Sequence, residues 1–233
     1  MNNPIPTIQV PSVINKVCSK NTEKLVSLKS EGFLVDSQYY KQGIAGSYKD
    51  CYVRESVVDM LKKAEDILPS DLRLKVYDAY RPICVQQRLW NYYRGVVKNE
   101  NPTLNDEEID FKTSFFVSKP SYDSFSPSLH NTGGAIDVTL VTRSGFALNM
   151  GTLFDDFTDR AWTNHFELYT DCEEVRNNRR ILYNAMIKAG FTNLPSEWWH
   201  YDYGDKFWAY FTGNDAIYDG IIDADLPDRF PLV

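Results

Sequence analysis

The stretch SLHNTGGAIDVTL, residues 128–140, places a turn signal in front of a run of β-forming residues. In a strand over residues 135–140 the side chains alternate between two faces, so Asp137 lies on the face opposite Ile136 and Val138. A carboxylate in such an apolar run is costly to bury unless another group compensates its charge. The stretch therefore predicts a buried strand and a compensating partner for Asp137, for which a metal cation is the candidate.

The turn before this strand predicts the position of a histidine. Glycine suits a place where the backbone turns sharply or passes close to another group, and the sequence Asn-Thr-Gly-Gly is a turn signal. A turn at Gly133 and Gly134 would fold His130 back beside Asp137. His130 is one of only three histidines in the chain.

The sequence EWWH, Glu197 to His200, supplies a third ligand and a second carboxylate. Two neutral imidazoles and one carboxylate leave a fourth tetrahedral position open for water, which is typical of a catalytic zinc site. Zinc bound by His130, Asp137 and His200 would lower the pKa of that water to about 7. Glu197 is then free to act as the general base. Residues three apart lie on opposite faces of a regular strand, so this pair requires a bulge or a strand end.

A candidate for stabilising the reaction lies earlier in the chain, in YDAYRP. Arg81 follows a predicted strand and precedes a predicted helix, in a connection of the kind that often carries functional groups. Its guanidinium is always charged and rich in donors, and it could stabilise a tetrahedral oxyanion.

Each of these residues also has a structural interpretation. A single histidine is more often structural than a ligand, Asp137 could be a satisfied buried carboxylate, and Glu197 and Arg81 could be ordinary charged side chains. The same ligand types form the facial triad of non-haem iron oxygenases, although there the first histidine and the carboxylate are usually two residues apart, and here the gap is seven. Di-iron bundles need two Glu-x-x-His pairs. His165 is interpreted as a structural or surface residue.

The rest of the chain predicts an α+β fold. Helical spacing predicts helices over residues 54–68, 84–97 and 105–116, and alternation predicts a strand within 71–82. Thr170 and Glu173 form a capping-box pattern that would open a helix ending at Gly190. The segments EWWHYDYG and FWAYF are interpreted as closing strands. Without a strict βαβ rhythm, an antiparallel sheet is favoured, in a single domain over 1–233 whose residues 1–30 are loosely patterned.

Composition narrows the classes of partner. The 233 residues carry a net charge of −7, which argues against nucleic acid or an anionic membrane as the main partner. No stretch approaches a membrane span and the N-terminus lacks the pattern of a signal peptide, so a soluble, cytoplasmic protein is expected. The four scattered cysteines are expected to be reduced thiols.

With these residues identified, the chain resembles the D-alanyl-D-alanine dipeptidases, a zinc peptidase family known from vancomycin resistance. The family pattern Ser-x-His-x-x-Gly-x-Ala-x-Asp matches residues 128–137, and its Glu-x-Trp-His matches residues 197–200. The segments YDAYRP and MGTLFDDF also resemble family segments. The order and spacing of the four motifs agree from about Phe33 to Tyr203.

The resemblance implies a fold shared with D,D-carboxypeptidases and hedgehog zinc domains, in which helices flank a central antiparallel sheet. It implies one zinc ion per chain on His130, Asp137 and His200, with Glu197 and Arg81 as catalytic residues. It places Ser128 near the substrate carboxylate and Asp155 near the substrate ammonium, with Tyr39 in the same amine pocket. The expected activity is zinc-dependent hydrolysis of D-Ala-D-Ala or a similar short D-configured dipeptide.

Two departures from the family pattern concern the substrate rather than the metal. The segment after Tyr39 reads YKQGIAGSYKD instead of an Asn-Phe-containing sequence, and Ala161-Trp162 stands where Ser-His is common. The alternatives are a D,D-carboxypeptidase acting on longer peptidoglycan stems and a non-catalytic zinc-binding module of the same fold. The sequence gives no indication of the oligomeric state.

Overall fold

A five-stranded sheet forms the centre of the protein, in a computed structural model that describes residues 3–9, 14, 16–115, 117–222 and 226–231. The strand order is β2-β4-β5-β7-β6, and a separate two-stranded sheet pairs β1 with β3. The strands are β1 (Leu25–Ser27), β2 (Leu34–Val35), β3 (Tyr52–Arg54), β4 (Leu72–Asp78), β5 (Ala135–Thr142), β6 (Thr192–Asn193) and β7 (His200–Asp202).

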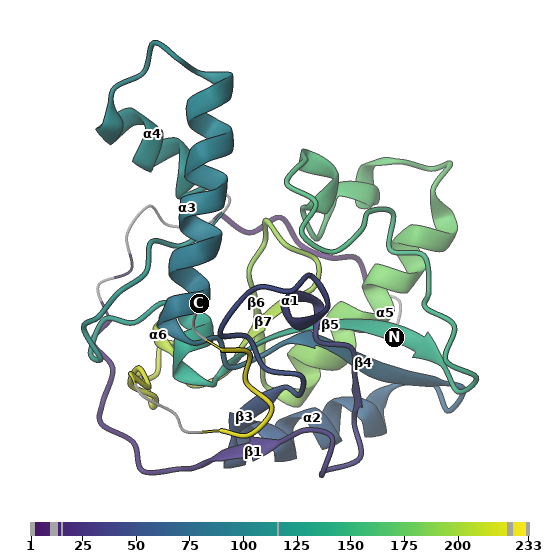
Figure 1. Cartoon of the computed structure of the whole chain (residues 1–233). Coiled ribbons are helices and arrows are strands. Elements are labelled where there is room, and N and C mark those ends of the chain that lie inside the picture. The colour runs from purple at the N-terminus through teal and green to yellow at the C-terminus, as the bar shows by residue number, and fades with distance from the viewer. Residues whose placement is uncertain (1–2, 10–13, 15, 116, 223–225, 232–233) are drawn as a thin grey trace.

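Six α-helices and three short 3-10 helices surround the sheets in the described part of the chain (Figure 1). The helices α3 and α4 project together from the body of the molecule. The α-helices are α1 (Gln38–Lys41), α2 (Glu55–Ile67), α3 (Ile83–Glu100), α4 (Asp106–Thr113), α5 (Glu173–Ala189) and α6 (Lys206–Thr212), and the 3-10 helices are η1 (Leu129–Thr132), η2 (Asp159–Ala161) and η3 (His165–Leu168).

The main core lies between one face of the central sheet and the helices α2 and α5. Leu61 of α2 and Leu182 of α5 are buried in the same apolar cluster as Val76 of β4 and Val138 of β5. Val76 and Val138 are direct neighbours across the antiparallel pair β4–β5. Because alternate residues of a strand face opposite sides, this packing leaves the other face of β5, which carries Asp137, for the functional site.

The predicted α+β class is confirmed, with one refinement of the sheet. Four of its five strands are joined by antiparallel pairs, whereas the edge strand β2 pairs with β4 in parallel. The predicted strand over 135–140 and the predicted helix over 54–68 are both present, within two residues of their expected ends. Phe116, the predicted end of the helix α4, and parts of the loosely patterned segment 1–30 lie outside the described residues.

Two local predictions are wrong. The segment FWAYF is part of the helix α6 and not a strand, because the Asp205 side chain accepts hydrogen bonds from the backbone of Phe207 and Trp208, both at 2.9 Å, and starts a helix. The expected capping box at Thr170 is also absent. The helix α5 begins after Cys172 without a side-chain cap.

The structure also bears on the cysteines and on membrane-spanning helices. The four cysteines are free thiols. None of the helices in the described ranges combines the length and the apolar character needed to cross a membrane.

Candidate metal and peptide site

The register of the central sheet brings three polar side chains into one row. Asp78 of β4 pairs with Asp137 of β5, and Asp137 pairs with His200 of β7. Paired residues on neighbouring strands present their side chains on the same face of a sheet. Asp78, Asp137 and His200 therefore lie side by side on the face away from α2 and α5.

A β-bulge in β4 places Asp78 in this row. The register shifts between Val76 and Asp78, so that Tyr77 is an extra residue relative to β5. In a regular strand Asp78 would share the core face with Val76, as alternation in the sequence predicts. The bulge turns its side chain to the face of Asp137 instead.

The turn before β5 positions His130 as the sequence predicts. His130 lies in η1, and Gly133 ends that helix with φ 74°, a left-handed conformation that favours glycine. Gly134 then passes so close to the backbone that a Cβ there would lie 2.3 Å from the carbonyl oxygen of Tyr203. The two glycines thus have separate tasks, one in the turn and one in a close approach.

Three donor atoms of this site face one another. His130 Nε2 lies 3.1 Å from His200 Nδ1 and 3.4 Å from Asp137 Oδ1, and His200 Nδ1 lies 3.1 Å from Asp137 Oδ1. Ligands about 2.0–2.1 Å from a tetrahedral zinc are separated from one another by roughly 3.3 Å. These are the residues that could hold a metal, and their spacing fits zinc.

Hydrogen bonds on the far sides of both imidazoles support the same conclusion. His130 Nδ1 lies 2.8 Å from the Ala79 carbonyl oxygen, and His200 Nε2 lies 2.8 Å from Asp202 Oδ1. If each of these nitrogens donates its proton outward, the inner nitrogens His130 Nε2 and His200 Nδ1 both present lone pairs. Two lone pairs at 3.1 Å repel unless a cation or a proton lies between them.

The electrostatics of the three candidate ligands also favour a bound cation. Burial alone would raise the pKa of Asp137, but His130 and His200 outweigh burial and lower it. Burial disfavours the charged form of His200, yet Asp202 and Asp137 raise its pKa well above the ordinary value. The fully buried Asp202 adds a second carboxylate against His200, so the ligand set fits a divalent cation.

Glu197 lies beside the ligands because it precedes the strand rather than belonging to it. Its backbone N–H donates to the Leu194 carbonyl, and its carbonyl accepts from the backbone of His200. This turn resolves the geometric difficulty that the spacing of three raised, since Glu197 Oε2 lies 3.8 Å from His200 Nδ1. Burial raises the pKa of Glu197, and Asp137 adds to that rise.

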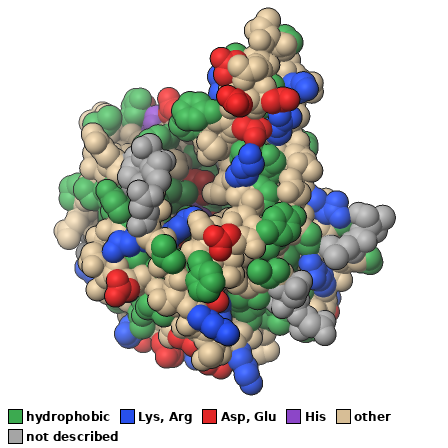
Figure 2. All heavy atoms as spheres, turned by 90° about the vertical axis from the view of Figure 1, so that its left-hand side faces the viewer, with side chains coloured by type: hydrophobic (Ala, Val, Ile, Leu, Met, Phe, Trp, Pro, Cys, Tyr) green, Lys and Arg blue, Asp and Glu red, His purple; other side chains and the backbone are tan. Residues whose placement is uncertain are grey.

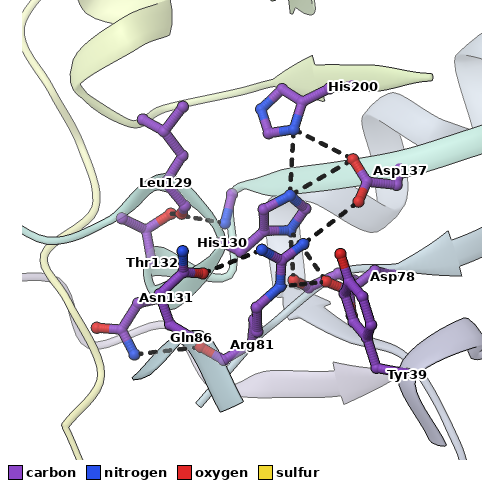
Figure 3. A network of polar contacts seen from close by, with 12 residues as sticks. Tyr39, Asp78, Arg81, Gln86, Leu129, His130, Asn131, Thr132, Asp137 and His200 are labelled. Atoms are coloured by element: carbon purple, nitrogen blue, oxygen red, sulfur yellow. Dashed lines mark hydrogen bonds and ion pairs between the residues drawn. The ribbon is translucent and has the colours of Figure 1, made fainter. Parts of the chain in front are cut away.

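Arg81 is held against the same face by four neighbouring side chains (Figure 3). Its Nε donates to Asp78 Oδ2 at 2.7 Å and its Nη1 to Gln86 Oε1 at 3.0 Å. Its Nη2 lies 3.5 Å from Asp137 Oδ2, and its guanidinium carbon lies 4.7 Å from the centre of the Tyr39 ring. The charge of Arg81 is thereby directed at the carboxylate of the ligand set.

The three remaining predicted residues line the same cavity. The Tyr39 hydroxyl donates to Asp155 Oδ1 at 3.4 Å, and burial raises the pKa of Asp155 to about 8. The buried Ser128 Oγ has no hydrogen-bond partner among the described residues. The structure therefore brings together all eight predicted site residues, in one cavity that is partly open to solvent. Figure 2 shows a hollow beside the projecting helices α3 and α4, with acidic side chains at its base.

Sequence reasoning missed three residues of this site: Asp78, Gln86 and Asp202. Each is buried and contacts a predicted site residue directly. The signals available were an aspartate three residues before Arg81, a glutamine five residues after it, and an aspartate two residues after His200 on the same face of a strand. Only the fold shows that these neighbours in sequence are also partners.

Comparison with known proteins places the chain in a peptidase family. The family model described as D-ala-D-ala dipeptidase (Peptidase_M15) matches residues 31–220. A D-alanyl-D-alanine dipeptidase from Synechocystis sp. is 29% identical over 210 residues, covering 81% of this chain and 85% of the relative. Another from Escherichia coli is 30% identical over 155 residues, covering 65% and 66%.

Among solved structures, a vancomycin-resistance D,D-pentapeptidase VanY mutant in complex with Zn(II) is similar at a TM-score of 0.44 and 15% identity, covering 72% of this chain and 83% of that one. Similarity this low carries no conclusion about the site. The family match spans most of the chain and includes every residue of the cavity described above, and on that basis the chain belongs to the D-ala-D-ala dipeptidase family of peptidases.

Proposed function

We propose that this chain is a zinc-dependent D,D-peptidase that hydrolyses D-alanyl-D-alanine or a similar short D-configured dipeptide. The observation that carries the proposal is the meeting of three donor atoms at 3.1–3.4 Å from one another, beside the carboxylate of Glu197. Membership of a peptidase family supports the reaction. Relatives named D-alanyl-D-alanine dipeptidase support the substrate.

His130 Nε2, Asp137 Oδ1 and His200 Nδ1 would hold one zinc ion per chain. Bound there, zinc would supply Lewis-acid polarisation of the scissile carbonyl and would lower the pKa of a water molecule. Asp202 and the Ala79 carbonyl orient the two imidazoles from behind. The zinc site is thus supported by hydrogen bonds from outside the ligand set.

Glu197 and Arg81 perform the remaining chemistry. Glu197 accepts a proton from the attacking water at its carboxylate and later donates that proton to the leaving amine. Its pKa is raised by burial, which makes its carboxylate a stronger base than an exposed glutamate. Arg81, held by Asp78 and Gln86, stabilises the negative charge that develops on the carbonyl oxygen.

The two ends of a free dipeptide carry opposite charges, and the cavity offers a group for each. The unpartnered hydroxyl of Ser128 donates to the terminal carboxylate. Asp155, with the Tyr39 hydroxyl beside it, accepts the terminal ammonium. The arriving ammonium favours the ionised form of Asp155, which the empty pocket disfavours. A peptide without a free amine at this point would leave a buried carboxylate unpaired.

Replacing Glu197 by glutamine tests the proposed base directly. Glu197→Gln keeps the shape of the side chain but cannot accept the proton, so kcat for D-alanine release from D-Ala-D-Ala should fall by roughly 10²–10⁴-fold. The zinc content should stay unchanged, because Glu197 is not a proposed ligand. Steady-state kinetics and metal analysis on the same preparation measure both quantities.

Three outcomes separate the proposed function from its rivals. Near-normal turnover by Glu197→Gln would remove Glu197 from the mechanism. Faster cleavage of a D-Ala-terminated tripeptide than of D-Ala-D-Ala would identify a D,D-carboxypeptidase. Stoichiometric zinc without turnover of either peptide would identify a binding module.

A further inference from the structure

Two aromatic side chains from different elements meet at the wall of the cavity. Tyr93 lies on α3, and Phe157 lies in the connection between β5 and η2. Both residues line the cavity that holds the metal ligands. Their ring centroids are 4.6 Å apart and their planes are inclined at 78°, an edge-to-face contact. The contact joins the projecting helix to the connection that carries Asp155.

The pair lies at the end of the cavity where Asp155 is found. Asp155 is two residues before Phe157, and after burial it is the charge that most raises the pKa of Tyr93. Phe154, on the other side of Asp155, packs against Tyr39 at 5.8 Å and against Trp199 at 5.5 Å between ring centroids. Asp155 is therefore held between two aromatic anchors, with φ 58° at its own backbone.

We propose that Tyr93 and Phe157 form a wall that ends the cavity at the free amine of the substrate and excludes peptides extended beyond that amine. The inference rests on the proposed function, in which Asp155 accepts the ammonium. An additional residue on the amine side would have to separate the two rings or displace the connection that carries Phe157. A dipeptide requires neither movement, so the wall discriminates by repulsion of the longer peptide rather than by attraction of the shorter one.

The proposal assigns to this pair a task that differs from that of Asp155. Asp155 distinguishes a charged amine from an uncharged amide, whereas the aromatic pair distinguishes a short substrate from a long one. Removing one ring while keeping Asp155 therefore isolates the effect of size. Asp155 is present in the variants and in the unchanged protein alike, so its own preference for the dipeptide cancels when their ratios are compared.

The experiment compares Tyr93→Ala and Phe157→Ala with the unchanged protein on D-Ala-D-Ala and Gly-D-Ala-D-Ala. The ratio of kcat/KM for the tripeptide to that for the dipeptide should rise by about tenfold or more in each variant. Phe146→Ala is the matched control, because Phe146 is 74% exposed and lies outside the cavity. Its ratio should equal that of the unchanged protein.

A second readout does not depend on turnover. In the Glu197→Gln background, calorimetric titration with Gly-D-Ala-D-Ala should show tighter binding once Tyr93 or Phe157 is also replaced by alanine. Thermal melting and zinc content of each variant show that it is folded and loaded.

An unchanged ratio in both folded variants would overturn the inference while leaving the proposed function intact. Equal cleavage of both peptides by the unchanged protein would overturn it as well, since no exclusion would then exist. Failure of the unchanged protein to cleave either peptide would contradict the proposed function and the inference together.

Discussion

Asp155 combines two features that are unfavourable on their own. Its backbone adopts φ 58°, a left-handed conformation that is uncommon outside glycine, and burial raises the pKa of its carboxyl to about 8. Strain and desolvation at one residue are often found where a ligand is recognised. At Asp155 the cost of desolvation would be offset on binding, because the proposed substrate brings a positive charge to the carboxylate.

Replacing Asp155 by asparagine should make the metal-free protein more stable at alkaline pH. The folded protein keeps the Asp155 proton up to about pH 8, whereas an unperturbed aspartate releases it near 3.8. The stability contributed by this proton is therefore lost as the pH rises through that window. Asparagine tolerates the same backbone conformation and does not ionise. Thermal melting at pH 8.5 should give Asp155→Asn a Tm at least about 2 °C above that of the unchanged protein.

The difference in Tm between Asp155→Asn and the unchanged protein should shrink steadily toward pH 4, where both side chains are neutral in the folded protein. A constant difference between the two proteins from pH 4 to 8.5 would contradict the raised pKa. The same variant, loaded with zinc, should show a higher KM for D-Ala-D-Ala, because the proposed ammonium partner is gone.

At single residues, the sequence singled out the proposed ligands but not the residues that hydrogen-bond to them. His130, Asp137 and His200 stand out in the sequence because polar groups of these types are unusual beside β-forming or aromatic neighbours. Asp78 does not stand out, because alternation alone assigns its side chain to the core. The direction of its side chain depends on a β-bulge, and no residue type in β4 predicts that bulge.

Elements were predictable where a local signal and the tertiary environment agree. The strand β5 is apolar on one face and bounded by glycines, and both properties suit its place at the centre of the sheet. The segment FWAYF has the composition of a strand, but Asp205 before it is an N-cap residue and Gly213 after it is a C-cap residue, as at the two ends of a helix. The caps decide the outcome because the aromatic side chains can pack in either form.

The close approach at Gly134 predicts a position where alanine is not tolerated. A Cβ at Gly134 would lie 2.3 Å from the Tyr203 carbonyl oxygen, which is backbone and cannot move aside cheaply. Gly134→Ala should therefore lower the free energy of unfolding by at least about 2 kcal/mol. Denaturant unfolding followed by circular dichroism measures the change.

Gly95 is the matched control for this substitution. It lies inside α3 and a Cβ there would meet nothing within 4 Å. Gly95→Ala should stabilise the protein by about 0.5 kcal/mol, since alanine is the better helix former. If both substitutions changed stability equally, the close approach at Gly134 would have no energetic consequence.

At the scale of the whole molecule, bound zinc should stabilise the folded protein, because the proposed ligands come from distant parts of the chain. Zinc that binds the folded form alone, at 100 times its dissociation constant, adds about 2.7 kcal/mol to the free energy of unfolding. Adding zinc to chelator-treated protein should therefore raise its Tm by about 5 °C or more. His200→Ala should abolish this zinc-dependent shift.

His165→Ala provides the matched control, since His165 stacks on Tyr169 away from the proposed ligands. It should retain both the zinc content and the full shift in Tm. Loss of the shift in His165→Ala, or its survival in His200→Ala, would contradict the proposed ligand set.

The row of side chains across β4, β5 and β7 also has a consequence for biosynthesis. His200, at one end of the row, contacts Asp137 and also His130 of η1, which lie 63 and 70 positions before it in the chain. A ribosome that has made β4 and β5 has not yet supplied His200, and the helix α5 must be completed before β7 can enter the sheet. The nascent chain consequently lacks the third proposed ligand until late in synthesis, so the proposed zinc site would be complete only when β7 has joined the central sheet.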